Sequence, residues 1–141
     1  METNNDCGFL IKQICDRLQA SANMELKDSG LTFSQVRYME YLCRNHPRKI
    51  PMKELEAAFN VSQPTVAGIV SRLEKKELIR TEQSTEDSRA KTVCVTEGGY
   101  AEFMHAKDSR DENEQRLLSP LSGAEQKQLR GMLSRILENL K

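Results

Sequence analysis

The residues best suited to chemistry lie on one side of a predicted helix over residues 62–76. On a helical wheel of about 100° per residue, cations and small polar groups gather opposite the apolar side, while Gln63 and Glu74 fall toward a border. A face without carboxylates can approach phosphates and base edges in a DNA major groove. We call it the outward face; it comprises Pro64, Gly68, Ser71 and Lys75, with Thr65, Arg72 and Lys76 along one border.

Two further features fit the same chemistry. Gly68 costs a helix about 1 kcal/mol relative to alanine, so either a nucleic acid approaches closely there or the glycine is merely tolerated. Arg89 lies at the tip of a predicted hairpin with Lys91 behind it, and a guanidinium there can enter a narrow minor groove. Asp87 is expected to brace either this tip or the Arg89 guanidinium rather than face DNA.

The sequence lacks the residue patterns that are typical of catalysis and of metal binding. The sequence contains no nucleophile elbow, no glycine-rich phosphate loop and no Cys/His pair with a third member, so an enzyme is not expected. The two histidines, His46 and His105, are about 60 residues apart, so neither a metal nor a cofactor is expected. The four cysteines form no C-x-x-C motif and are expected to be free thiols.

The hydrophobic spacing predicts a scaffold that is mainly α with a small β-hairpin wing. A long helix is expected over residues 9–26, and a second begins after a capping box of Thr32 and Gln35, with its buried side formed by Val36, Met39, Tyr41, Leu42 and Cys43. The segment 52–59 predicts a short helix that ends at Asn60 in the left-handed conformation. Ser62 then caps the next helix, with Pro64 in its first turn.

Strand-like segments follow at residues 79–83 and 90–95, with Val93 and Val95 on one side, and Thr96 to Gly99 are expected to close this hairpin. One helix is predicted from Tyr100 to Leu118. The last helix begins after a capping box of Ser122 and Glu125.

Charge and length limit the function classes. The 141 residues suit one domain, and 21 basic residues balance 21 acidic ones, which argues against indiscriminate nucleic-acid coating. Residues 61–91 contain six cations against five acids, so DNA binding must depend on arrangement, on doubling in a dimer and strongly on salt. No apolar run reaches the roughly 20 residues of a membrane span, so a cytoplasmic protein is expected.

The run LEKKELIRTEQSTEDSRAKTVCVTEGG at residues 73–99 resembles the signature of the MarR family of winged helix-turn-helix bacterial transcription regulators. That family typically shows L-E-x-x-G-L-I, a wing with D-x-R and then Thr-x-x-G. The resemblance implies that Ser62–Lys76 is the recognition helix, which adds Ser62 and Gln63 to the outward face. It also implies that Asp87, Ser88, Arg89 and Lys91 form the DNA-binding wing. Glu77 replaces the usual glycine, where it is strained by about 1 kcal/mol or ends the helix differently.

The resemblance also implies a homodimer with intertwined terminal helices. The expected organisation is a single domain over 1–141, with a DNA-binding lobe at 31–98 and dimerisation helices at 8–27 and 100–141. Apolar stripes that a small domain cannot bury alone fit this expectation. They comprise Leu10, Ile14 and Leu18 near the N-terminus, and Leu129, Met132, Leu133, Ile136, Leu137 and Leu140 near the C-terminus.

MarR-like proteins commonly respond to small aromatic or lipophilic compounds or to peroxides. Phe33, Tyr38 and Met39 are either lining residues of a ligand pocket between the dimerisation helices and the DNA-binding lobe, or plain core. Cys15, and less so Cys7, is either a redox sensor or a small apolar residue on a buried stripe. The sequence thus predicts a sequence-specific regulator of double-stranded DNA with a pseudo-palindromic operator, a repressor released by a ligand or oxidant. The alternative is a winged-helix interaction or dimerisation module without DNA binding.

Overall fold

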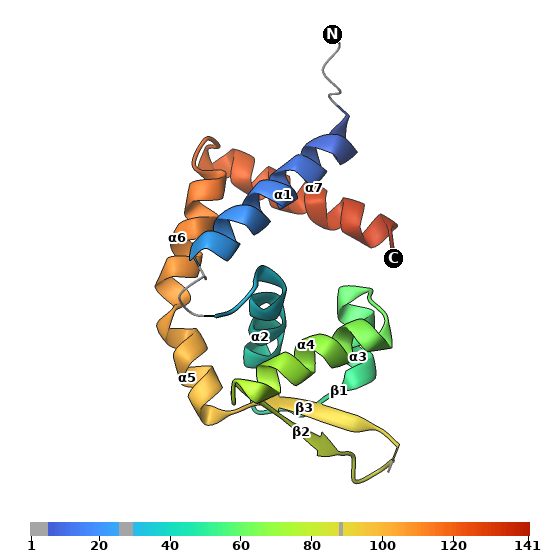
Figure 1. The fold of residues 1–141 in the computed structure, drawn as a ribbon. Helices are drawn as coiled ribbons and strands as arrows, with labels where there is room; N and C mark the ends of the chain where they lie inside the picture. Colours follow the sequence, from blue (N-terminus) through green and yellow to red (C-terminus); the bar gives the residue numbers. More distant parts are fainter. Residues whose placement is uncertain (1–5, 26–29, 88) are drawn as a thin grey trace. The chain divides into compact units, whose positions relative to one another are not determined.

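The computed structural model describes residues 6–25, 30–87 and 89–141, without the side chains of 22–25, 108 and 109. The chain divides into two compact units between Phe103 and Met104. This boundary falls inside the segment predicted as the C-terminal dimerisation helices. Figure 1 gives the element labels. None of the described helices is long and apolar enough to cross a membrane.

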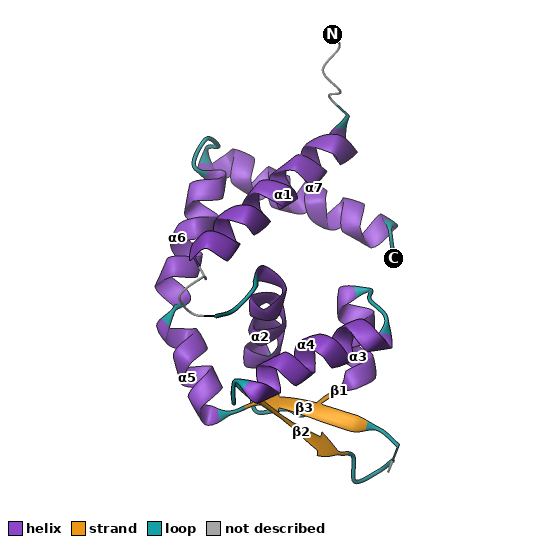
Figure 2. Ribbon diagram, in the orientation of Figure 1, coloured by secondary structure: helices purple, strands orange, loops and turns teal. Residues whose placement is uncertain are grey.

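The first unit contains helices and a small antiparallel sheet. Its helices are α1 (Cys7–Glu25), α2 (Phe33–Arg44), α3 (Met52–Phe59) and α4 (Gln63–Lys75), and α5 (Glu97–His105) runs across the boundary. The strands are β1 (Ile50–Pro51), β2 (Ile79–Gln83) and β3 (Lys91–Val95), in the order β1-β3-β2. Figure 2 shows α2, α3 and α4 on one side of this sheet.

Local signals in the sequence place most helix ends. Thr32 and Gln35 form the predicted capping box at α2, with N–H to side-chain oxygen distances of 3.2 and 3.3 Å. Asn60 ends α3 in the left-handed conformation at φ 51°, as predicted. Ser62 is the N-cap residue of α4 and Pro64 lies in its first turn, but the Ser62 hydroxyl contacts the Thr65 hydroxyl at 3.1 Å and makes no capping hydrogen bond to the backbone.

The core of the first unit lies between these helices and the sheet. Fully buried side chains of α4 and α3, such as Val66, Leu73 and Leu55, meet Ile50 and Val93 of the strands. The predicted buried side of α2 is correct for Met39, Leu42 and Cys43. It is wrong for Val36 and Tyr41, which are half-buried, whereas Tyr38 and Gln35 are buried. Tyr38 is buried because its ring stacks on Phe59 of α3, with the ring centroids 4.3 Å apart.

The sheet differs from the prediction of a two-stranded hairpin. Ile50 pairs with Val93 and Pro51 with Thr92, which adds β1 to the outer edge of β3. Two residues are too short a run for the alternation that identifies a strand. The pairing of β2 with β3 is as expected, with Ile79 opposite Val95 and Thr81 opposite Val93.

Residues Thr96 to Gly99 do not close the hairpin, because they begin α5. The Thr96 hydroxyl accepts a hydrogen bond from the backbone N–H of Gly99 at 2.9 Å and so caps the helix. Gly99 is required by packing, because a Cβ atom there would lie 2.2 Å from the carbonyl oxygen of Leu78. Through these contacts Thr96 and Gly99 of the Thr-x-x-Gly pattern join the start of α5 to Leu78, the residue before β2.

The second unit contains α6 (Lys107–Leu118) and α7 (Gly123–Asn139). The prediction of one helix from Tyr100 to Leu118 is wrong, because Ala106, at φ −85° and ψ 6°, separates α5 from α6. Alanine is the best helix former, so no local signal marks this break. The predicted capping box of Ser122 and Glu125 is present at the start of α7.

Candidate nucleic-acid interface

Helix α4 is held by its apolar side. Val66 and Leu73 have no exposed area and Val70 is buried, while Ile69 is half-buried. This burial leaves the opposite side of the helix in solvent. Ser62, Gln63, Pro64, Thr65, Ser71, Arg72 and Lys75 are all exposed, and Gly68 is half-buried among them.

Gly68 is not required by the packing of the chain itself. A Cβ atom built there would meet only the Arg72 guanidinium, at an ordinary 3.8 Å. The helix therefore carries the propensity cost of glycine without an internal reason for it. The open surface at Gly68 is compatible with both interpretations of the sequence, close approach by a nucleic acid and a merely tolerated glycine.

The acid of α4 is turned away from the outward face. The Glu74 carboxylate accepts hydrogen bonds from the Thr81 hydroxyl at 2.6 Å and from the Thr81 backbone N–H at 2.9 Å. These bonds lower the pKa of Glu74 below its ordinary value. The charged carboxylate thus fastens α4 to β2, and it does not stand among the cations of the helix.

Lys76 departs from the predicted outward face. Its ammonium donates to the carbonyl oxygen of Gly30 and, at 2.9 Å, to Oε1 of Gln35. These acceptors belong to the start of α2 and the connection before it. Lys76 therefore does not project alongside Lys75, and the sequence could not show this because its partners are 46 and 41 residues away.

The wing tip is organised by Asp87, as predicted. Its carboxylate accepts a hydrogen bond from the backbone N–H of Arg89 at 2.9 Å, and its carbonyl oxygen accepts one from Ala90 at 3.0 Å. The bond goes to the backbone of Arg89, which leaves the Arg89 side chain exposed, as is Lys91. Ser88, the fourth predicted wing residue, lies outside the described residues.

The outer part of the sheet adds a cation that the sequence did not single out. Lys49, just before β1, forms a 2.7 Å ion pair with Glu82 of β2, and Arg80 lies 3.7 Å from the same carboxylate. The Glu82 side chain raises the pKa of Lys49. Lys49 reaches Glu82 because β1 joins the sheet. The sequence did not predict the strand β1, and it therefore did not predict this contact of Lys49 either.

The predicted ligand-pocket residues separate into two groups. Phe33 and Tyr38 line a cavity of about 190 Å³ together with Phe59 and Ile69. Met39 does not, and at 1% exposed it belongs to the core, as the alternative of plain core predicted. A larger groove of about 650 Å³ is lined by Gln19 of α1, Gln35 of α2 and, on α4, Gly68 and Arg72.

The candidate redox cysteines are accessible in the single chain. Cys7 and Cys15 are exposed, whereas Cys43 and Cys94 are buried. The interpretation of Cys15 as a buried apolar residue therefore does not describe the single chain. No group of three His, Cys, Asp or Glu side chains that could hold a metal occurs among the described residues.

The predicted dimerisation stripes are exposed as well, each considered on its own helix. On α1, Leu10 and Ile14 are exposed and Leu18 is half-buried. On α7 no residue is buried, and all but one of the stripe residues are exposed, the exception being the half-buried Leu129. We call the set Leu129, Met132, Leu133, Ile136, Leu137 and Leu140 the α7 stripe.

Helices α3 and α4 joined by a tight turn, followed by the β2–β3 hairpin, define a winged helix-turn-helix. The profile described as "MarR family" matches residues 29–90. A regulator of similar sequence and solved structures of similar fold agree with this resemblance to the MarR family. The resemblance agrees with the expectation that the chain is not an enzyme.

The relatives are transcription regulators of similar fold. The chain is 28% identical over 97 residues to the HTH-type transcriptional regulator PecS of Dickeya dadantii (strain 3937), a match that covers 69% of this chain and 58% of PecS. It is similar to MepR of S. aureus in a MepR–DNA complex, at 25% identity and TM-score 0.87, over 95% of this chain and 98% of MepR. A probable transcriptional regulator from Pseudomonas aeruginosa is 28% identical with TM-score 0.81, over 94% and 98% of the two chains.

Proposed function

We propose that the protein is a homodimeric transcription regulator that binds a pseudo-palindromic site in double-stranded DNA. The observation that carries the proposal is the distribution of charge on α4. Arg72 and Lys75 are exposed on the outward face, while the carboxylate of Glu74 is bound to Thr81. A dimer would present two such helices to successive major grooves, about 34–36 Å apart.

The wing supplies the second contact of the proposal. Asp87 fixes the backbone of the tip, and Arg89 extends from it to enter the adjacent minor groove. MepR, the relative of similar fold, is described in complex with DNA. The proposed partner is bacterial DNA, so the proposed location of the protein is the cytoplasm.

A gel-shift assay tests the proposal with a duplex selected from a random pool, or with the DNA upstream of the protein's own coding sequence. Replacement of Arg72 or Arg89 by alanine should weaken binding, and the slope of log K against log salt should fall by about 0.9 for each phosphate contact that is removed. Arg130→Ala on α7 is the matched control, because the same charge is removed from outside the proposed interface. Full binding by both variants at low salt would favour the alternative of an interaction module without DNA binding.

We further propose that the protein represses transcription until a small-molecule ligand or an oxidant releases it. The cavity of about 190 Å³ is lined by Phe33 and Tyr38 of α2 and by Ile69 of α4, so an aromatic or lipophilic occupant there would alter the position of the recognition helix. For the oxidant, Cys15 is the exposed thiol to test. Cys15→Ser should abolish peroxide-induced release, with Cys7→Ser as the control, and unaltered release would remove Cys15 from the proposal.

A further inference from the structure

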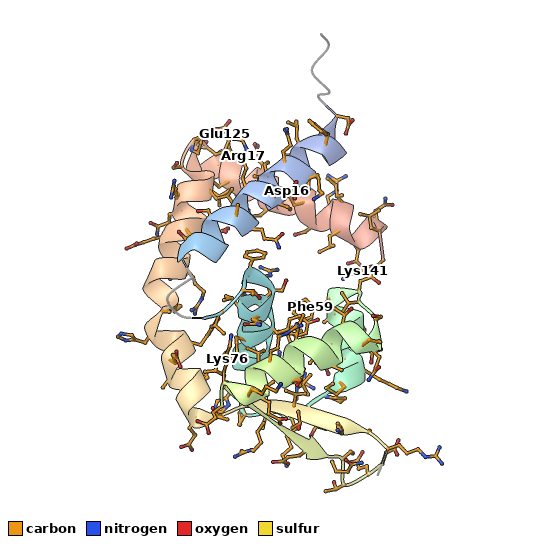
Figure 3. All side chains as sticks on the ribbon, in the orientation of Figure 1. Asp16, Arg17, Phe59, Lys76, Glu125 and Lys141 are labelled. Atoms are coloured by element: carbon orange, nitrogen blue, oxygen red, sulfur yellow. The ribbon has the colours of Figure 1, made fainter. Side chains whose placement is uncertain are left out.

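Lys76 joins the end of the recognition helix to the start of α2. It is the C-cap residue of α4, and Figure 3 labels it at that end of the helix. Its ammonium donates to Gln35 and to the carbonyl oxygen of Gly30, which precedes α2. A cation in this position is also favoured by the negative end of the α4 dipole.

The acceptors of this ammonium are themselves fixed. Gln35 is 5% exposed, and the oxygen that accepts from Lys76 also accepts from the Thr32 backbone N–H at 3.3 Å. Gly30 has φ 72°, a conformation that favours glycine. Both acceptors lie where the connection from α1 enters α2, so the position of this connection is linked directly to the C-terminal end of α4.

Lys75 gives the contrast. Lys75 is the last residue of α4 and Lys76 is its C-cap; both residues are exposed, but only the ammonium of Lys76 is held by neutral oxygens at the start of α2. Two of the three N–H donors of the Lys76 ammonium are engaged here, and a phosphate contact reached by extending the side chain away from α2 would break both hydrogen bonds. Loss of the hydrogen bond to Gln35 would leave the buried Oε1 atom of Gln35 with one donor fewer.

We propose that Lys76 is a positioning residue, which holds the recognition helix to the start of α2 through Gln35 and Gly30 and does not contact DNA. The inference rests on the proposed function, and it replaces the assignment of Lys76 as a DNA contact. A displacement of Gly30 or of the first turn of α2 would then be transmitted to α4 through this side chain.

The test compares two neighbouring lysines, with the duplex obtained by selection from a random pool. Lys76→Met and Lys75→Met each remove a charge and keep an unbranched apolar side chain. Lys75→Met should lower the salt slope by about 0.9 in each subunit. Lys76→Met should weaken binding about fivefold to tenfold at each salt concentration and leave the slope unchanged.

A second variant acts on the other side of the contact. Gln35→Met removes the acceptor while the side chain keeps its length, and it is expected to weaken DNA binding with an unchanged salt slope. The double variant should bind about as well as the weaker single variant, because both changes break the same link. Thermal unfolding of each variant measures general destabilisation separately. If the variants only lost folded protein, their effects on DNA affinity would add in the double variant, whereas loss of one shared contact gives effects that do not add.

Each outcome decides the proposal. A fall in slope for Lys76→Met equal to that of Lys75→Met would show a phosphate contact and overturn it, as would unchanged affinity. If Lys76→Met does not fold, Gln35→Met decides, because release of a DNA-contacting Lys76 would leave binding equal or tighter. Absence of DNA binding by the unaltered protein, in contrast, would remove the proposed function itself, and this inference with it.

Discussion

Helices α4 and α7 have the same apolar periodicity and opposite surroundings. On α4 the apolar side chains Val66 and Leu73 are completely buried, against α2, α3 and the sheet. On α7 Leu137 and Leu140 are 62% and 75% exposed in the single chain. The periodicity shows which side chains require burial, but it does not show whether the chain itself or a second copy covers them.

The largest effect is expected when a charge is placed in the α7 stripe. Leu133→Asp places a carboxylate in the α7 stripe, and burial of that charge in a dimer is strongly unfavourable. We expect the mass in sedimentation equilibrium to fall from twice the 16.1 kDa of the chain to that of a single chain. DNA affinity should fall more than about 100-fold, because only one half-site contact remains.

Ser134→Asp is the control for this change, because it adds the same charge to α7 outside the stripe. It should leave the mass and the DNA affinity almost unaltered. A dimer that survives Leu133→Asp would show that the α7 stripe is not the interface, and the exposed stripe of α1 would then be tested in the same way.

A second prediction compares truncation in the two helices. Leu73→Ala leaves a cavity in the core and should lower the free energy of unfolding by about 2–5 kcal/mol at any protein concentration. Leu137→Ala should instead lower the unfolding midpoint more as the protein is diluted, because the truncated side chain stabilises the association of two chains. Thermal melts over a hundredfold range of concentration measure both, and concentration-independent destabilisation by Leu137→Ala would contradict the proposed role of Leu137 in the dimer.

The third prediction concerns two glutamates that accept hydrogen bonds, Glu54 of α3 and Glu125 of α7. In α3 the Glu54 carboxylate binds the Arg48 guanidinium at 2.7 and 3.0 Å and the Tyr41 hydroxyl at 2.6 Å. Arg48, and then Tyr41, lower the pKa of Glu54 below its ordinary value. The unfolded chain therefore binds this proton more readily, so the stabilisation is complete above the unfolded pKa of about 4.3 and is lost as the pH falls through the folded pKa.

Glu54→Gln should accordingly lower the free energy of unfolding by about 1 kcal/mol or less at pH 7, since the site is partly exposed. The difference from the unaltered protein should shrink as the pH falls below about 4. In α7 the hydrogen bonds of Glu125 with the backbone and then the side chain of Ser122 lower the pKa of its carboxyl group, so the loss on Glu125→Gln should also shrink at low pH, although glutamine completes the same capping box. Denaturant unfolding over this pH range measures both variants, and a pH-independent loss for Glu54→Gln would exclude the carboxylate as its cause.

Sequence reasoning succeeded where the signal is local. Capping boxes at Thr32 and Ser122, the left-handed Asn60 and the order of helices and hairpin each depend on residues a few positions apart. It failed where contacts join distant segments. The strand β1 exists only through pairing with β3, and Lys76 is turned from the outward face by Gln35, 41 residues away.

The same distinction applies to the candidate site. The exposure of the outward face and the role of Asp87 follow from helical periodicity and turn chemistry. The burial of Met39 and the binding of Glu74 to Thr81 depend on how α2, α4 and β2 pack. Periodicity could place Glu74 at a border of the helix, but only the position of β2 determines where its carboxylate is bound.

The smallest expected effect lies at the end of α4, where the chain turns into β2. The predicted strain at Glu77 is present, because this residue adopts the left-handed conformation at φ 61°, and the helix thus ends as it would with the glycine usual in the family. Glu77→Gly should raise the free energy of unfolding by about 0.5–1 kcal/mol. Asn60→Gly, at φ 51°, should change it by only a few tenths of a kcal/mol, because asparagine tolerates this conformation. Helix α7 ends without a left-handed residue, so this gain in stability should be confined to the winged helix. Denaturant unfolding measures it. Equal gains for Glu77→Gly and Asn60→Gly would show that the side chain of Glu77 adds no strain of its own.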